Sequence, residues 1–121
     1  ITASDPAVQA ARHRALEGVA ELAQATKALL GLLGSAQDHA LAVAVPYLKL
    51  TGTVLGGWLH AKSAAIAAAR LAAGGADADF YRSKLATARF YAEHILPTAE
   101  ALARVVQRGG AAVAEVDAAL I

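Results

Sequence analysis

The residue types in this chain that most often carry chemistry are four histidines and a pair of glutamates. The histidines are scattered along the chain at His13, His39, His60 and His94. Metal-binding histidines usually occur at a ligand spacing such as H-E-x-x-H, and no such pair is present. Glu17 and Glu21 share one helix face, as paired catalytic carboxylates would, but basic residues flank them as on an ordinary solvated face. We therefore predict no metal site and no catalytic residue in this chain.

A short basic run is the other charged candidate. Arg82, Lys84 and Arg89 lie near the expected start of a helix, and a helix N-terminus attracts phosphate groups. The alternative interpretation is a basic face exposed to water. Serine, histidine and aspartate all occur, but no pattern orients them as a catalytic triad.

The glycines mark helix ends and helix contacts rather than a nucleotide-binding loop. Gly74-Gly75 and Gly109-Gly110 belong to no Gly-x-Gly-x-x-Gly motif, and we expect them to end helices with positive φ. Gly52 and Gly56 are four residues apart, a spacing that lets a neighbouring helix approach closely. We assign no cofactor-binding residue to any of these glycines.

The composition excludes several classes of protein. Of the 121 residues, 57% are hydrophobic and none is cysteine, which excludes a disulfide framework, an iron–sulfur site and a thiol nucleophile. The formal net charge of +1 is too balanced for a dedicated binder of nucleic acid or of anionic membranes. The longest uncharged stretch in mid-chain, residues 50–61, is shorter than the ~18–20 residues of a membrane-spanning helix. We expect no membrane span, no signal peptide and a cytoplasmic protein.

Hydrophobic periodicity divides the chain into three long helices and two short helical segments. The predicted long helices cover 6–33 and 47–73, with a third that follows a cap at Asp77 or Asp79 and closes at Gly109-Gly110. The short apolar segments are 35–45 and 111–121. Linkers this short make neighbouring helices antiparallel. We predict one all-α domain over residues 1–121, an up-down antiparallel bundle that is similar to a four-helix bundle.

Local signals bound the helices. The run Ser4-Asp5-Pro6 combines a capping side chain with a proline at the first helical position. Gly34 is predicted to end the first helix in a left-handed conformation. Asp77 or Asp79 is expected to cap the third helix.

Two prolines are expected to bend the bundle. Pro46 precedes the second long helix, where it ends or bends the segment before it. Pro97 lies inside the third helix, and the apolar pattern keeps its phase across it. We therefore predict proline kinks in the second and third helices, and a third helix that continues through its kink.

Each long helix has a predicted core face. In the first helix this face comprises Val8, Ala15, Val19, Leu22, Thr26, Leu29 and Leu33. In the third it comprises Tyr81, Leu85, Ala88, Ala92, Ile95, Ala99, Leu102 and Val106. The second helix has one thin polar stripe, formed by Lys49, Thr53, Gly56, His60, Ser63, Ala67 and Arg70. So little polar surface predicts a central helix with buried large residues, namely Leu48, Val54, Leu55, Trp58, Leu59 and Ile66.

Two segments resemble a known family. They are PYLKLTGTVLGGWLHAKSAA at 46–65 and DFYRSKLATARFYAEHILPTAEALARVVQRG at 79–109, and the pattern FYxxKLxxARFYAEHxLP is matched without a gap over 80–97. Together they resemble the extra C-terminal domain of a bacterial branch of the FAD-dependent acyl-CoA dehydrogenases. That branch includes the methylthiopropanoyl-CoA dehydrogenases. The first helix resembles this domain only in length and position.

The resemblance implies a parent enzyme that oxidises acyl-CoA to 2-enoyl-CoA with FAD. The flavin and the catalytic base would belong to a core that precedes Ile1, and a first residue other than methionine agrees with a piece of a longer protein. None of the five glutamates matches the family's base, so no catalytic residue is carried over. We expect this domain to hold no cofactor and to be structural, packing on the core or at the interface of a homo-oligomer.

Two other functions remain open from the residues alone. A free-standing helical adaptor module without enzymatic activity would explain the composition equally well. An enzyme built inside the bundle would need inward carboxylates or histidines, whereas the predicted core faces hold Leu, Ala, Val and Ile. The residues encoded immediately before Ile1 would distinguish an accessory domain of a dehydrogenase from a free-standing adaptor.

Lys62 interrupts the apolar pattern of the second helix. It projects between Leu55, Leu59 and Ile66, where an unpaired ammonium sealed among aliphatic side chains would be too costly. Its stem can cover apolar surface while its nitrogen reaches water or a carboxylate of this chain. Alternatively, the seam opens onto the dehydrogenase core and the charge meets an acidic group there. We also predict that Leu59 and Leu85 are core residues where the second and third helices cross.

Overall fold

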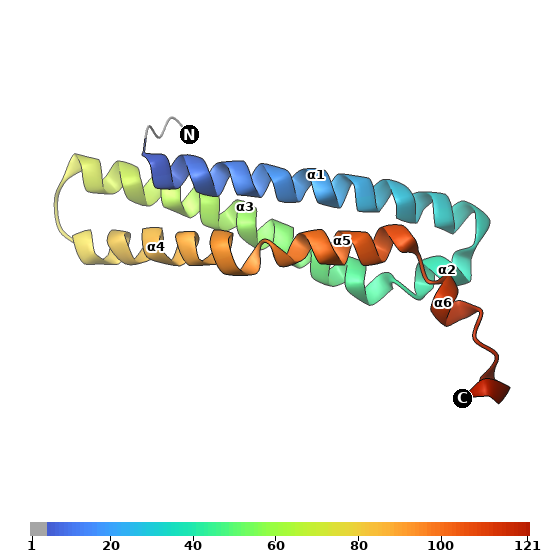
Figure 1. Ribbon diagram of the computed structural model, residues 1–121. Helices are drawn as coiled ribbons and strands as arrows, with labels where there is room; N and C mark the ends of the chain where they lie inside the picture. The colour runs from blue at the N-terminus through green and yellow to red at the C-terminus, as the bar shows by residue number, and fades with distance from the viewer. Residues whose placement is uncertain (1–4) are drawn as a thin grey trace.

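All regular structure in the described part of the chain is helical. The computed structural model describes residues 5–121, and the predicted cap at Ser4 lies outside this range. The elements are α1 (Pro6–Ser35), α2 (Gln37–Leu41), α3 (Ala44–Ala73), α4 (Ala78–Phe90), the π-helical turn η1 (Tyr91–Ile95), α5 (Thr98–Arg108), α6 (Ala111–Ala114) and the 3₁₀ turn η2 (Ala118–Leu120). Helix α1, helix α3 and the α4–α5 stretch run side by side (Figure 1). This confirms the predicted all-α up-down bundle.

Helix α1 begins as predicted but ends differently. The Asp5 carboxylate accepts a hydrogen bond from the backbone N–H of Ala7 at 2.8 Å, and Pro6 occupies the first helical position. The predicted stop at Gly34 is wrong, because the helix continues through Gly34 to Ser35 without positive φ. It ends at Ala36, whose N–H donates to the Leu32 carbonyl at 2.7 Å.

Pro46 lies in the first turn of a helix instead of kinking one. Helix α3 starts at Ala44, three residues earlier than predicted, so that Pro46 lies in its first turn. A proline there removes no intrahelical hydrogen bond, because the first N–H groups of a helix have no carbonyl partner in it. The predicted kink in the second long helix is therefore wrong.

The third long helix does continue through its predicted bend, but with one extra residue in the turn. Between α4 and α5 the backbone takes a π-helical turn, in which the Leu96 N–H donates to the Tyr91 carbonyl at 2.8 Å. Backbone angles stay helical through Leu96 and Pro97. A π-helical turn closes an i→i+5 hydrogen bond instead of the i→i+4 bond of an α-helix. At this turn Leu96 is 4% exposed, whereas the predicted core residue Ile95 is 37% exposed.

The interior is built from small residues. Of the leucines in the described residues, only Leu50 and Leu96 are buried, and alanines supply most of the buried side chains. Leu50 and Val54 of α3 pack on Ala25 of α1 and on α5 in one cluster. A second cluster brings α1, α3 and α4 together around Ala64 and Ala88. Small side chains let the helix backbones approach closely, and the close packing keeps the thin core dense.

The predicted faces of α1 and α3 are therefore wrong in part. In α1 the expected core residues Val19 and Leu33 are exposed, whereas Val8 and Ala15 are buried as predicted. In α3 the central position is correct, since it contacts α1, α4 and α5, but five of the predicted core residues point outward. These are Leu48, Leu55, Trp58, Leu59 and Ile66. Only part of the predicted polar stripe is covered. Thr53, Gly56 and His60 contact Tyr91 and Ala67 is buried, whereas Lys49, Ser63 and Arg70 are exposed.

The C-terminal segment is tied to α2 before it leaves the bundle. The Gly110 N–H donates to the His39 carbonyl at 3.1 Å, and a Cβ at Gly110 would collide with Ala42. Gly110 has φ −99°, so positive φ was wrongly predicted there, while Gly109 has the expected φ of 74°. Beyond α6 the tail projects away from the bundle (Figure 1). Among the described residues, no helix has the length and hydropathy that a bilayer crossing requires.

Candidate functional site

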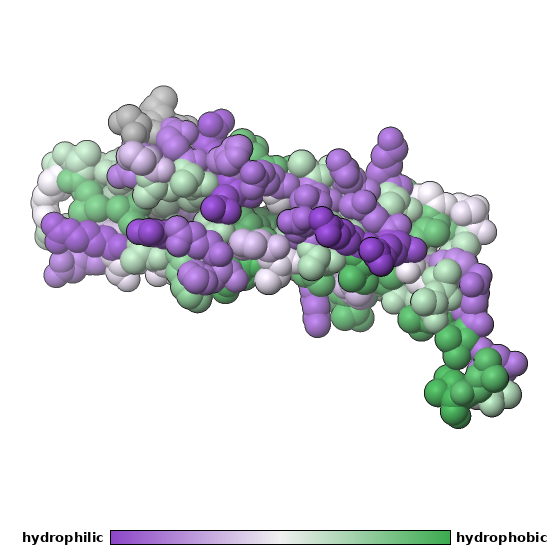
Figure 2. Space-filling model, viewed as in Figure 1, coloured by the Kyte–Doolittle hydropathy of each residue, from purple (hydrophilic) through white to green (hydrophobic). Residues whose placement is uncertain are grey.

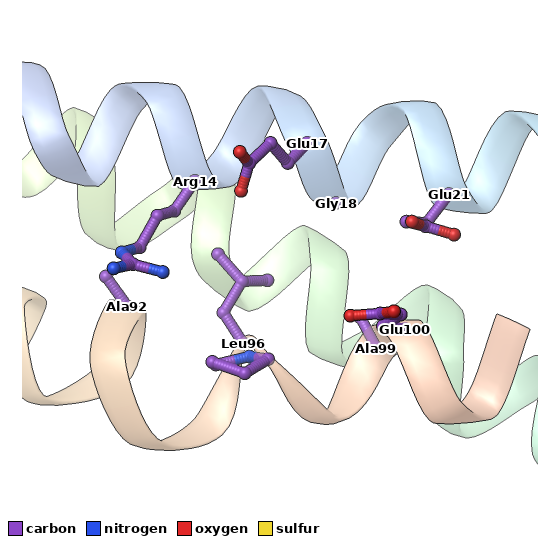
Figure 3. A pocket seen from close by; sticks show the side chains of 9 residues that line it. Arg14, Glu17, Gly18, Glu21, Ala92, Leu96, Ala99 and Glu100 are labelled. Carbon is purple, nitrogen blue, oxygen red and sulfur yellow. The ribbon is translucent and has the colours of Figure 1, made fainter.

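A cleft lies between α1 and α5 beside the π turn. It has a volume of about 380 Å³ and is lined by Arg14, Glu17, Gly18, Glu21, Ala92, Leu96, Pro97, Ala99 and Glu100. Leu96 rises from the lower helix toward Gly18 and closes the floor (Figure 3). The three carboxylates are spread along the rim, two from α1 and one from α5 (Figure 3). The structure thus adds Glu100 to the pair of glutamates that the sequence singled out.

Two of the rim carboxylates, Glu17 and Glu100, are paired with residues of their own helices. Glu17 pairs with His13 at 3.0 Å, and Glu100 pairs with Arg104 at 2.8 Å, with both glutamates largely exposed to water. A catalytic acid or base at neutral pH usually depends on burial or a close like charge to tune it. Glu17 and Glu100 are exposed and lie on different helices, and Glu21 is only partly buried. The cleft is therefore a polar surface depression.

The four histidines lie in separate surroundings. His13 pairs with Glu17, while His39 lies 3.5 Å from the Glu115 carboxylate. The His94 ring stacks on Phe90 with centroids 5.0 Å apart. No group of three possible metal ligands occurs anywhere in the described residues. Helical stacking and ion pairing account for the histidines that the sequence marked as candidates.

The basic run on α4 is divided among local partners. Arg82 pairs with Asp79 at 3.0 Å, and the Lys84 ammonium lies 5.1 Å above the Phe80 ring. Arg89 pairs with a glutamate one turn later at 3.0 Å. The predicted cap is also absent, since Asp77 precedes α4 but makes no side-chain capping hydrogen bond. These contacts favour the solvated basic face over a phosphate site.

Tyr91 makes a partly buried polar contact between the third helical stretch and α3. Its hydroxyl donates to the Thr53 carbonyl at 2.8 Å, and its ring lies 4.5 Å from that of His60. Gly56 makes room for this ring, because a Cβ there would collide with the Tyr91 hydroxyl. Burial raises the pKa of Tyr91. Gly56 thus allows the predicted close approach, whereas Gly52 is exposed with no neighbour within 4 Å.

A second groove, between α1 and α3, is mostly apolar. Its volume is about 130 Å³ and its lining is Val8, Arg12, Ala15, Leu16, Val19, Trp58, Ala61 and Lys62. Lys62 is exposed, and its ammonium lies 4.9 Å above the Trp58 ring. This confirms that the nitrogen is not sealed in the core. The aromatic contact that holds Lys62 was not predicted, although its i, i+4 spacing from Trp58 is a readable signal.

Comparison with known proteins agrees with the resemblance seen in the sequence. Residues 1–117 match the family described as "Acetyl-CoA dehydrogenase C-terminal like", and the chain belongs to this family. It is 40% identical over 90 residues to a protein of Ruegeria pomeroyi named 3-methylmercaptopropionyl-CoA dehydrogenase, covering 74% of this chain and 15% of that protein. It is 33% identical over 100 residues to the broad-specificity linear acyl-CoA dehydrogenase FadE5 of Mycobacterium tuberculosis, covering 76% of this chain and 16% of that protein.

These matches define the class of the chain as a helical accessory domain of the acyl-CoA dehydrogenases. The chain spans about one sixth of the length of the two relatives.

Proposed function

We propose that this chain is the C-terminal accessory domain of an enzyme that oxidises acyl-CoA to 2-enoyl-CoA with FAD, and that the domain itself is structural. The observation that carries the proposal is the family match over residues 1–117 combined with the interior of the bundle. No polar or charged side chain is buried among the described residues. A bundle of this kind holds no acid, base or nucleophile in a desolvated position, which catalysis on an acyl-CoA requires.

Neither of the two clefts described above suits FAD. The flavin nucleotide carries a pyrophosphate, and the rim of the α1–α5 cleft presents three carboxylates, Glu17, Glu21 and Glu100, against the single cation Arg14. Negative charges so placed repel a phosphate group. The α1–α3 groove carries two cations but has only about 130 Å³ of space. We assign FAD and the acyl-CoA to the preceding core of the parent enzyme.

The proposed role is architectural. Large apolar residues on the outside of α1 and α3 support packing on that core or at the interface of a homo-oligomer, because monomers seldom expose contiguous apolar patches of that extent. The proposal includes a cytoplasmic parent without nucleic-acid partners. The alternative, a free-standing adaptor module, would have no dehydrogenase sequence encoded before Ile1.

The test compares the 121-residue chain with the complete polypeptide that contains it. The complete polypeptide is expected to purify with flavin absorbance and to reduce an electron acceptor with a linear acyl-CoA. The 121-residue chain is expected to show neither property. Flavin absorbance or acyl-CoA turnover in the short chain contradicts the structural role, and a complete polypeptide without flavin contradicts the assignment to the parent enzyme.

A further inference from the structure

We infer that the uncovered side of α1 and α3 is the surface by which this domain docks on the catalytic core, and that the core meets it with an apolar strip bordered by carboxylates. This inference rests on the proposed function, and it adds the residues of the interface and the chemistry of the partner surface. The name "α1–α3 face" is used below for its residues, Arg12, Leu16, Val19, Leu30, Leu48, Leu55, Trp58, Leu59, Lys62 and Ile66.

The first component is a row of large apolar side chains along α3. Leu48, Leu55 and Ile66 are 70%, 54% and 54% exposed, and Leu59 is 50% exposed. At 100° per residue these four positions fall within a stripe about 40° wide. The stripe lies on the opposite side of the helix from Leu50, which is fully buried. The contacts of α3 with α1, α4 and α5 leave this side of the helix uncovered.

The second component is a parallel row on α1. Leu16, Val19 and Leu30 are exposed on the flank of α1 that borders α3. The α1–α3 groove runs between the two rows, with Trp58 in it. Two neighbouring helices with apolar rows and a groove between them form the seat of a further helix in a bundle. By contrast, the face made by α1 and the α4–α5 stretch is largely polar (Figure 2).

The charges around this face have one sign. Arg12 and Lys62 line the groove, and α3 contains no aspartate or glutamate in its 30 residues. The two glutamates of α1 lie on the other side of that helix, in the cleft with α5. A covering surface must supply acceptors to these cations as water is removed, because an unpaired buried charge is costly. The partner surface therefore bears carboxylates.

A second copy of this chain could cover the apolar row, but it would supply no carboxylates to the cations beside that row. An antiparallel copy of α3 would place Leu55 opposite Leu59 and Gly52 opposite Lys62. Such a pair would bring only cations to the groove, since neither copy has a carboxylate on this face. The core of the parent enzyme is the occupant that agrees with the comparisons, because the matched region is only 15% and 16% of the two relatives.

The test uses cysteine accessibility in the complete dehydrogenase. This chain contains no cysteine, so Leu59→Cys introduces one reporter on the α1–α3 face, and Val105→Cys introduces a matched reporter at a position of α5 that is 45% exposed. Maleimide labelling is followed by peptide mass spectrometry in the native enzyme and in urea. We expect native labelling of Leu59→Cys to be at least about tenfold slower than that of Val105→Cys, with equal rates in urea.

The prediction that the partner surface is acidic is tested with a second matched pair of variants, at Lys62 and Lys84. Lys62 and Lys84 each lie over an aromatic ring, at 4.9 and 5.1 Å, but only Lys62 is on the α1–α3 face. Lys62→Glu is expected to speed amide hydrogen exchange in α3 of the complete enzyme, whereas Lys84→Glu leaves α3 exchange unchanged. Equal exchange in both variants contradicts an acidic partner surface.

The outcomes separate this inference from the function on which it rests. An enzyme with flavin and activity in which Leu59→Cys labels as fast as Val105→Cys overturns the docking surface alone. A complete polypeptide without flavin overturns the proposed function. If the 121-residue chain sediments as a dimer and Leu59→Cys is protected in that dimer, the occupant is a second copy, and the assignment to the core is wrong.

Discussion

Leu96 lies so close to Gly57 that a methyl group at Gly57 would force the Leu96 side chain to move. A Cβ at Gly57 would lie 2.8 Å from Cδ1 of Leu96, and one at Gly18 on α1 would lie 3.2 Å from the same atom. One leucine from the π turn therefore inserts between two glycines on two different helices. The contact fixes how near α1, α3 and the third helical stretch approach one another.

Gly57→Ala is expected to destabilise the chain by about 1–3 kcal/mol, because Leu96 would have to leave its rotamer or push the helices apart. Gly52→Ala on the same helix is the control. Its Cβ meets nothing within 4 Å, so we expect a gain of about 0.5–1 kcal/mol from helix propensity. Urea unfolding followed by circular dichroism measures both changes. A loss of stability in both variants would mean that Leu96 is not the determining contact.

The burial of Leu96 and the exposure of Ile95 predict which of these two neighbours contributes more to the stability of the chain. Leu96→Ala leaves a cavity beside Gly57 and is expected to cost about 2–5 kcal/mol. Ile95→Ala changes a more exposed side chain and is expected to cost about 1 kcal/mol or less. The free energy of unfolding from urea titrations distinguishes the two. The reverse order would show that Ile95, and not Leu96, faces the interior of the bundle.

Exposure predicts that Leu59 contributes little to the stability of the 121-residue chain. Leu59→Ala is expected to change its unfolding free energy by no more than about 0.5 kcal/mol, whereas Leu50→Ala is expected to cost about 2–5 kcal/mol. Leu85 is half-buried against the cluster around Ala64, so Leu85→Ala should fall between them. Thermal melts of the three variants provide the ranking. A large loss for Leu59→Ala would show that its side of α3 is covered within this chain.

The raised pKa of Tyr91 predicts that the stability of the folded chain depends on pH in the alkaline range. Burial raises its pKa in the folded state above the unfolded value, so the folded chain holds the proton more tightly. The corresponding stability is fully present below about pH 10 and is lost as the pH rises through the folded pKa. Tyr91→Phe lacks this contribution and loses the hydrogen bond to Thr53. Urea midpoints at several values between about pH 8 and pH 11 should therefore fall less steeply in the variant, and parallel profiles would contradict this.

The helices were predictable because their signals are local. Asp5 and Pro6 begin α1 with groups that lie within one turn, and Gly74 ends α3 with a φ of 76° that favours glycine. The family resemblance was equally local, since it rested on contiguous patterns such as residues 80–97. Neither inference required knowledge of which helix faces meet.

The core faces were less predictable because hydrophobicity does not say what covers a residue. Leu59 and Ile66 have the periodicity of a core, yet the core of this chain is on the other side of α3, where alanines let the helices approach. The π turn was hidden for a different reason. Around this turn Leu96 packs between Gly18 and Gly57, and Tyr91 packs against Gly56. These contacts join positions that are distant in the sequence, so no local pattern announces them.

The alanine-rich interior has a consequence for how the domain unfolds. Hydrophobic stabilisation grows with the apolar area removed from water, and an interior of small side chains removes little of it per residue. Many of the large apolar side chains of α1 and α3 are exposed on the α1–α3 face instead. If the proposed docking is correct, covering that face stabilises the folded helices by binding, and calorimetry of the complete enzyme would record this domain melting at a higher temperature than the 121-residue chain.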